Sequence, residues 1–187
     1  MVDYKTFKKE YLNEWVDRSQ AARKAAEELA NKEVRAPLQD KYASMIKGLV
    51  FELDGKMLEF KDRNEENLAQ GRGGLFTWDE AMKRFGKPDE DGWRLPTKEE
   101  LYDLADKNSF KFKDSKGVFD NRLVLPACGY HTISQQVMYV GDFADYWSST
   151  PEDDTTAWYL RIDQGGVTIS YTHVREGLSV RLVREIL

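Results

Sequence analysis

The composition of the chain changes abruptly near Lys47, and this change limits the folds that are open to it. The residues before Lys47 are rich in Ala, Glu, Lys and Arg, contain no Gly and include one proline, Pro37. After Lys47, Gly, aromatic and β-branched residues become frequent. Helices favour the first composition, whereas strands and turns favour the second. We therefore predict a helical arm over residues 1–47 and a globular domain over residues 48–187, which together form an α+β protein.

The segment from Asp3 to Val34 is predicted to form one long helix, because apolar residues recur in it at helical spacing. A helix with one apolar face has to bury that face. The arm therefore packs on its own domain, on other copies of the chain or on another protein. Arg18 interrupts the stripe, so the pattern leaves these alternatives open. The aromatic members of the stripe are Tyr4, Phe7, Tyr11 and Trp15.

Short strands and tight turns are predicted after the arm. Asp54-Gly55 separates two strand-like runs, residues 49–53 and 57–60, and this dipeptide is a strong hairpin signal. Asp163-Gln164-Gly165-Gly166 is predicted to be a turn between two later strands. Further strands are predicted at residues 123–125, 137–140, 157–162, 167–171 and 178–183.

Two short helices are predicted to begin at capping boxes of the form Ser/Thr-x-x-Glu. Thr77 precedes Glu80 by three residues, and Thr97 precedes Glu100 by the same spacing. In this interpretation Glu100 reaches back to the amide of Thr97, and Glu99 favours the positive end of the helix dipole. The alternative interpretation of Glu99 and Glu100 is a pair of carboxylates for acid–base catalysis.

Charge and cysteine usage exclude several classes of protein. The net charge is -5, which disfavours binding to nucleic acid. The single cysteine, Cys128, lies in an apolar stretch and is interpreted as a core residue. Neither His131 nor His173 has a second ligand at metal-binding spacing, so we predict no metal and no cofactor. No apolar run is long enough for a secretory signal at the N-terminus or for a membrane span, so no membrane partner is predicted.

Five motifs follow one another in the order of a known family. They are FTWDEA at 76–81, GWRLPT at 92–97 with Glu100-Leu101, LPACGY at 125–130, YWSST at 146–150 and GLSVRLVR at 177–184. In this order they resemble a bacterial and phage family of C-type-lectin-like domains. That family includes the Fibrobacter-type paralogous domains, the C-terminal domain of a Legionella collagen-like adhesin and, more distantly, the formylglycine-generating enzymes. The resemblance covers roughly the last three quarters of the chain, without the arm.

The resemblance implies a C-type-lectin-like fold, in which two helices pack on small antiparallel sheets and the first and last strands lie together. It also implies that Trp93, Arg94, Trp147 and Arg181 are framework residues. If Arg181 is buried, it needs a carboxylate or several carbonyl groups as partners. Formylglycine-generating enzymes use a pair of cysteines, which Cys128 alone does not supply, so we expect no enzymatic activity.

Related proteins display a ligand-binding face between the YWSST and GLSVRLVR motifs. Short polar side chains with interspersed Tyr and His suit adaptable recognition. Thr168, Ser170 and Thr172 lie in this segment. The candidate ligand contacts are Glu152, Asp153, Asp154, Thr155, Thr156, Gln164, Tyr171 and His173.

We therefore expect a non-enzymatic binding module that is displayed on a virion and recognises a host-surface glycan or protein. Its arm would contact other virion proteins or further copies of the chain, so that the protein is a homo-oligomer. One alternative is a purely structural decoration protein of a capsid or tail. Another is an adhesin-like lectin module on a bacterial surface.

Overall fold

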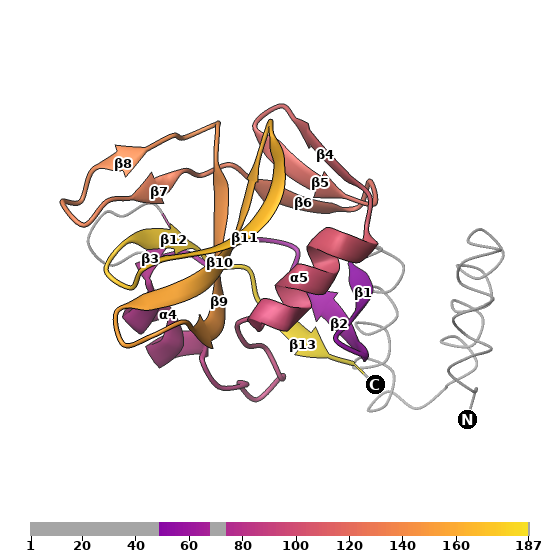
Figure 1. Cartoon of the computed structure of the whole chain (residues 1–187). Coiled ribbons are helices and arrows are strands. Elements are labelled where there is room, and N and C mark those ends of the chain that lie inside the picture. Colours follow the sequence, from indigo (N-terminus) through magenta and orange to yellow (C-terminus); the bar gives the residue numbers. More distant parts are fainter. Residues whose placement is uncertain (1–48, 68–73, 187) are drawn as a thin grey trace, which may run out of the picture. The chain divides into compact units, whose positions relative to one another are not determined.

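The computed structural model describes residues 49–67 and 74–186, and it contains three antiparallel or mixed sheets and two short helices (Figure 1). The mixed α+β character predicted for the domain is confirmed. The predicted arm over residues 1–47 lies outside the described residues, and the predicted boundary near Lys47 stays a prediction. No helix in the described ranges is long and apolar enough to cross a membrane.

The two ends of the described region meet in one small sheet. Strand β1 (Val50–Leu53) pairs with β2 (Lys56–Phe60), and β2 also pairs with β13 (Val183–Glu185). The turn between β1 and β2 is Asp54-Gly55, and both residues have positive φ, 49° and 70°. This is the backbone that an Asp-Gly hairpin requires, so the predicted hairpin is confirmed.

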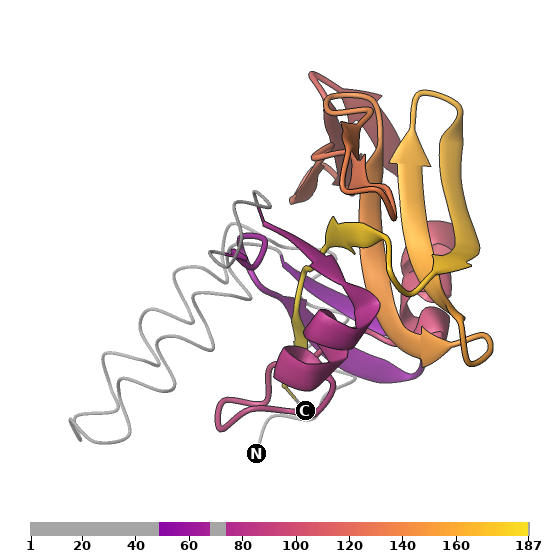
Figure 2. The same cartoon turned by 90° about the vertical axis from the view of Figure 1, so that its left-hand side faces the viewer.

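The largest sheet has the strand order β11-β10-β9-β12-β7-β8, with β3 (Leu75–Thr77) paired to β12. Strands β9 (Ala144–Pro151), β10 (Thr156–Asp163) and β11 (Gly166–His173) are eight residues long each, and they form a meander that dominates one side of the domain (Figures 1 and 2). The remaining members are short: β7 (Tyr130–His131), β8 (Val137–Met138) and β12 (Gly177–Ser179).

A third sheet was only partly predicted. It contains β4 (Phe110–Lys113), β5 (Lys116–Phe119) and β6 (Leu123–Pro126) in that order. Only β6 was expected, because the other two strands carry lysines and a Gly, which depress strand propensity.

The strand predicted at residues 178–183 is wrong in its extent, because β12 ends at Ser179 and β13 begins at Val183. Between them the carbonyl groups of Val180 and Leu182 accept from the amides of Glu65 and Lys61, so this stretch pairs with a loop instead of a strand. The strand predicted at residues 137–140 is shorter than expected, since only β8 forms.

Both helices begin as predicted. Helix α4 (Trp78–Phe85) has Thr77 as its N-cap, and α5 (Lys98–Lys107) has Thr97. In each, the threonine hydroxyl accepts from the amide of the third helical residue, and that residue's glutamate accepts from the threonine amide. Each capping box satisfies two backbone donors that the first helical turn would otherwise leave unpaired.

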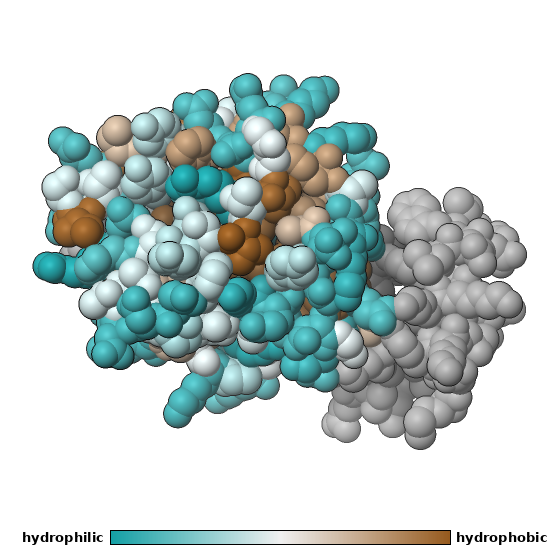
Figure 3. Space-filling view, viewed as in Figure 1, coloured by the Kyte–Doolittle hydropathy of each residue, from teal (hydrophilic) through white to brown (hydrophobic). Residues whose placement is uncertain are grey.

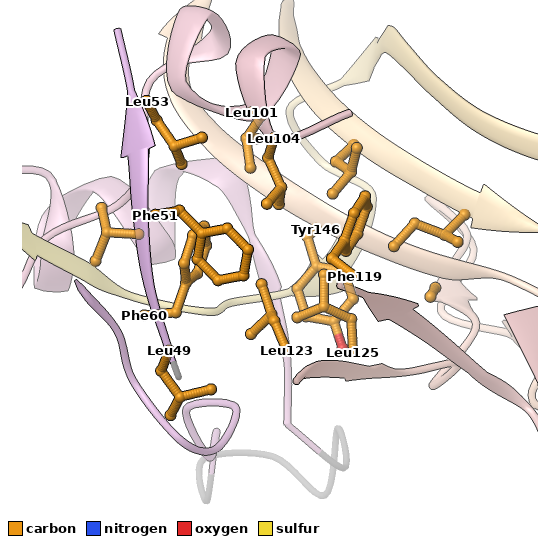
Figure 4. Close-up of a cluster of buried hydrophobic side chains, with 14 of the residues drawn as sticks. Leu49, Phe51, Leu53, Phe60, Leu101, Leu104, Phe119, Leu123, Leu125 and Tyr146 are labelled. Carbon is orange, nitrogen blue, oxygen red and sulfur yellow. The ribbon is translucent and has the colours of Figure 1, made fainter. Parts of the chain in front are cut away.

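Two apolar clusters hold the elements together. The first lies between α5 and the strands of all three sheets, and Figure 4 shows Leu101 and Leu104 of α5 pointing into it toward Tyr146. The second surrounds the fully buried Trp147 and includes Phe76, Leu95 and Leu178. The first cluster fixes α5 against β9, β10 and β11, which positions the site described next.

Candidate ligand-binding site

The acidic start of α5 is a structural element. Glu100 is fully buried, and its carboxylate accepts from both terminal nitrogens of Arg94, at 2.8 and 2.6 Å. The same carboxylate accepts from the amide of Thr97. The Glu100 hydrogen bond is the main reason why the pKa of Arg94 is raised. With its oxygens occupied in this way Glu100 is not a free base, so the capping interpretation is confirmed.

The other framework residues are also held by specific partners. Trp147 donates from its indole nitrogen to the carbonyl oxygen of Phe76 at 2.8 Å. Arg181 is almost fully buried and donates to the carbonyl oxygens of Lys61 and Val124 and to the side-chain oxygen of Asn64. Carbonyl groups therefore satisfy Arg181, and burial lowers the pKa of its guanidinium. Trp93 lies under the Arg184 guanidinium, at 4.5 Å from its ring centroid.

The end of β9 holds the first turn of α5 in place. The amide of Ser149 donates to the carbonyl oxygen of Pro96 at 2.8 Å, and the amide of Lys98 donates to the hydroxyl of Thr150 at 3.0 Å. These bonds place the Lys98 side chain beside strand β10. The YWSST motif therefore positions the helix start that carries Lys98.

An aromatic pair lies beside this helix start. Trp158 of β10 is opposite Tyr171 of β11, and their rings meet edge to face with centroids 5.2 Å apart. The ammonium of Lys98 lies 3.4 Å from the Trp158 ring centroid, and the Trp158 indole nitrogen donates to Glu152 at 2.6 Å. Tyr171 is 53% exposed. We refer to Lys98, Glu152, Trp158 and Tyr171 as the Trp158 site.

This arrangement is suited to holding a ligand. An aromatic ring with an exposed face provides apolar contact area, and polar groups beside it fix the orientation of the ligand. Lys98 and Glu152 restrain Trp158 from two sides, so that the ring is preorganised for a partner. A cation over an aromatic ring at an exposed position contributes about 0.5–1 kcal/mol.

The turn that follows β9 is ordered by one of the predicted contacts. The carboxylate of Asp153 accepts from the amides of Thr155 and Thr156, at 2.7 and 2.8 Å, and from the Thr155 hydroxyl at 2.9 Å. The Thr155 amide is the main reason why the pKa of Asp153 is lowered. Asp153 and Thr155 thus shape the turn, and the neighbouring Asp154 is exposed.

The predicted contacts divide into two groups. Thr156 lies opposite His173, so the 152–156 turn is beside the end of β11 that carries Tyr171. Gln164 lies in the turn at the opposite end of the hairpin. Seven residues of extended chain separate it from Tyr171, which is about 23 Å. The structure therefore brings together Glu152, Asp153, Asp154, Thr155, Thr156, Tyr171 and His173, and it does not bring Gln164 to them.

Trp158 and Lys98 were missed from the sequence. The sequence pattern places Trp158 in an apolar strand and Lys98 at a helix start, and it indicates no ligand contact for either. A signal for Trp158 was present, because the turn at residues 163–166 fixes the register of the hairpin and therefore places Trp158 opposite Tyr171. The position of Lys98 depends on its contact with Thr150, 52 residues away, which no local pattern predicts.

The opposite face of β10 carries a separate polar cluster. Arg161 donates to both carboxylate oxygens of the fully buried Asp145, at 2.9 and 2.6 Å. Its guanidinium lies 4.3 Å from the ring centroid of Phe143. Burial raises the pKa of Asp145, and Arg161 opposes this shift. Asp145 and Arg161 form an ion pair in which each charge has its partner, so this cluster stabilises the sheet.

Residues 49–67 and 74–186 contain no group of three His, Cys, Asp or Glu side chains placed to hold a metal ion. Cys128 is half-buried and lies 3.8 Å from the side-chain nitrogen of Asn64.

The geometry thus defines a small α+β domain with a surface aromatic site. A family model described as the Lcl C-terminal domain matches residues 58–184, about two thirds of the chain. The chain therefore belongs to the Lcl C-terminal domain family, and this confirms the part of the predicted resemblance that concerns that family. No curated protein matches it.

Proposed function

We propose that the chain is a non-enzymatic binding module and that the Trp158 site is its recognition surface. The observation that carries this proposal is the exposed Tyr171 ring, which meets a Trp158 ring held by Lys98 and Glu152. Rigid aromatic side chains give contact area at low entropic cost, and Tyr and Trp are enriched among the residues that dominate binding energy.

The ligand in this proposal is a host-surface glycan or protein. The exposed Tyr171 ring would take the apolar face of a sugar ring or an apolar side chain, because Lys98 already lies over the Trp158 ring. Lys98, Glu152 and Asp154 would bind hydroxyl, amide or charged groups at its rim. His173 would extend the contact along the end of the hairpin, whereas the hydroxyl oxygen of Thr156 is buried and does not face a ligand.

The state of the buried acids supports a non-enzymatic role. Glu100 and Asp145 are the fully buried carboxylates of the described region, and each is held by an arginine. A general acid or base must reach the proton that it transfers, and neither group is free to do so. A lone Cys128 also does not supply the cysteine pair of the formylglycine-generating enzymes.

The finer identity of the fold and the place of display are part of the proposal. The C-type-lectin-like fold is supported by the pairing of β2 with β13, which joins the beginning and end of the domain, and by two short helices among small sheets. Display on a virion is supported by the sequence resemblance to phage proteins. Capsid and tail genes beside the gene for this chain would favour the virion, and surface-export genes would favour an adhesin-like module on a bacterium.

A structural decoration protein is the second candidate function. The observation that favours it is a group of exposed apolar residues in the β7–β8 hairpin and the loop after it, namely Ile133, Val137, Met138, Tyr139 and Val140. Exposed apolar patches of this kind mark contacts with other proteins.

A glycan array and a panel of fixed bacterial cells test the proposal with the full chain. We expect the wild type to be retained on specific spots or strains, and the double variant Trp158→Ala/Tyr171→Ala to lose that retention. The control is Gln164→Ala, which changes an exposed residue of the same hairpin about 23 Å away. Equal retention of the double variant and the wild type, with both folded, would rule out the Trp158 site as the recognition surface.

A further inference from the structure

Strand β11 is an open edge of the largest sheet. It pairs with β10 on one side, and no described strand pairs with its other side (Figure 2). It is eight residues long, its sequence GVTISYTH contains no Lys, Arg, Asp, Glu or Pro, and its register with β10 has no bulge. Figure 3 shows apolar residues over this hairpin within a mainly polar surface. Long, regular edges of this kind are ready templates for pairing with another strand.

The other sheet edges each carry a feature that blocks pairing. Strand β4 presents Lys111 and Lys113, and β8 is only two residues long. Side chains occupy a backbone acceptor in β1 and in β6, since Arg122 donates to the carbonyl oxygen of Val50 and Arg181 to that of Val124. Strand β13 exchanges backbone hydrogen bonds with Arg94 through Val183, and β3 is only three residues long. Lysines, short length and covering side chains are the usual protections of an edge. Strand β11 is long and carries no lysine, and the elements that lie against it are α5 and β4.

One hydrogen bond at the end of β11 shows which of its residues bond to β10 and which have backbone groups that point outward. The amide of Val174 donates to the carbonyl oxygen of Thr155, which makes residues 155 and 174 a hydrogen-bonded pair. Such pairs alternate along an antiparallel ladder. Residues 168, 170 and 172 therefore bond to β10, whereas the backbone groups of Val167, Ile169 and Tyr171 point to the open edge.

An antiparallel copy of β11, centred on Ser170, fits this edge. In that register Ile169 of one copy lies opposite Tyr171 of the other. The backbone groups of both residues point outward, so they can form hydrogen bonds on each side of the centre. The side-chain pairs are also favourable, because an aromatic residue faces a β-branched one and Thr168 faces Thr172. At the centre, Ser170 faces its own counterpart.

The charges at the two ends of β11 are complementary as well. Asp163 is the last residue of β10 and accepts from the amide of Gly165 at 2.6 Å with one carboxylate oxygen, and Arg175 follows β11. Because paired strands run in opposite directions, the Asp163 end of one copy lies beside the Arg175 end of the other. The nearby acid Glu176 is occupied by the hydroxyl of Thr172 at 2.5 Å.

We propose that two copies of the chain associate through the outer edges of their β11 strands, antiparallel and centred on Ser170. The sheet then continues from one copy into the other about a twofold axis, which is the commonest symmetry of homo-oligomers. Both Tyr171 side chains lie on the same face of this continuous sheet. The association does not involve the N-terminal arm and does not depend on the ligand.

Disulfide cross-linking tests this pairing in the full chain. Ser170 and its counterpart form a non-hydrogen-bonded pair, for which the Cα atoms are about 4.5 Å apart, and this separation suits a disulfide. In a Cys128→Ser background, we expect Ser170→Cys to become mostly covalent dimer on mild oxidation. The matched control is Thr168→Cys, which is more exposed but about 14 Å from its own counterpart in this register. It should remain monomeric on a non-reducing gel.

Three results would overturn the proposal. They are a monomeric Ser170→Cys with a wild-type melting temperature, equal cross-linking of both variants, and cross-linking of Thr168→Cys alone. Pairing of β11 with a different protein would give the first of these results.

Two charge variants at Ser170 test the same pairing if the cysteine variant fails to fold. In sedimentation velocity, the Ser170→Asp and Ser170→Lys variants should each form a smaller oligomer than the wild type, because like charges meet at the twofold axis. An equimolar mixture should regain the wild-type oligomer. An unchanged mass for both single variants, or no gain on mixing, would also overturn the proposal.

Discussion

Thr97 and Lys98 are neighbours at the start of α5, but they belong to two different regions of the molecule. Thr97 forms part of a buried network with Glu100 and Arg94, in which every charged group has a partner. Lys98 extends over Trp158 at the surface, next to the exposed Tyr171. One helix start can therefore stabilise the fold with one residue and, in the proposed function, contact a ligand with the next. Substitutions in the two regions should therefore have opposite signatures.

Removal of Glu100 is expected to have the largest effect. Breaking a buried ion pair by deleting one partner costs about 3–5 kcal/mol, because the remaining charge is left without compensation. Glu100→Ala should lower the free energy of unfolding by that amount in urea titrations. Its control is the exposed neighbour Glu99, for which Glu99→Ala should stay within about 0.5 kcal/mol. Equal effects of the two substitutions would contradict the claim that the buried ion pair of Glu100 stabilises the fold more than an exposed acid does.

The cap itself should matter less than the ion pair. Thr97→Ala removes the hydroxyl that accepts from the Glu100 amide, and loss of an N-cap costs about 1 kcal/mol. Thr77→Ala should cost a similar amount at α4, where the Thr77 hydroxyl accepts from the Glu80 amide in the same way. Thermal unfolding of both variants checks this, and a much larger loss at Thr97 would mean that the cap and the ion pair are coupled.

The Trp158 site should show the reverse signature. Lys98→Met keeps the length of the side chain but removes its charge, so only the contact of about 0.5–1 kcal/mol with Trp158 is lost. The unfolding midpoint should change little. Ligand affinity should fall by about two- to fivefold if Lys98 also donates one hydrogen bond to the ligand, since such a bond contributes about 0.5–1 kcal/mol. A fully stable Lys98→Met protein with unchanged affinity would show that the cation does not take part in recognition.

The smallest effect is expected at the turn beside this site. Because backbone amides hold the pKa of Asp153 below its ordinary value, its contribution to the turn is present above pH 4 and is lost as the pH falls through the pKa of the folded state. An NMR titration of the Thr155 and Thr156 amides should report this transition below pH 4. A midpoint at or above the ordinary value of an aspartate would contradict the hydrogen bonds described for this turn.

The sequence predicted the local features of the fold well. Asp54-Gly55 and the two capping boxes act over four residues or fewer, so their conformations depend on local chemistry. The break of the last strand between Ser179 and Val183 depends on contacts with a loop more than a hundred residues earlier. Such long-range pairing is not visible in a periodic pattern.

The same division applies to the candidate site. Tyr171 and the acids of the 152–156 turn were predicted because they lie in one polar segment between two motifs. Arg94 as the partner of Glu100, and Lys98 as the partner of Trp158, were not predicted, since both depend on how α5 packs against the sheet. Gln164 was included because it lies in the same segment, and the register of the hairpin places it at the far end.

The most direct test of the account is the affinity of Tyr171→Ala for a glycan or cell-surface protein that retains the wild type. Isothermal titration of that ligand should show a loss of at least about tenfold, as for the removal of a central aromatic contact. The urea midpoint of the same protein should match that of the wild type, because the ring is more than half exposed. Unchanged affinity in a folded Tyr171→Ala protein would contradict the assignment of recognition to the Trp158 site.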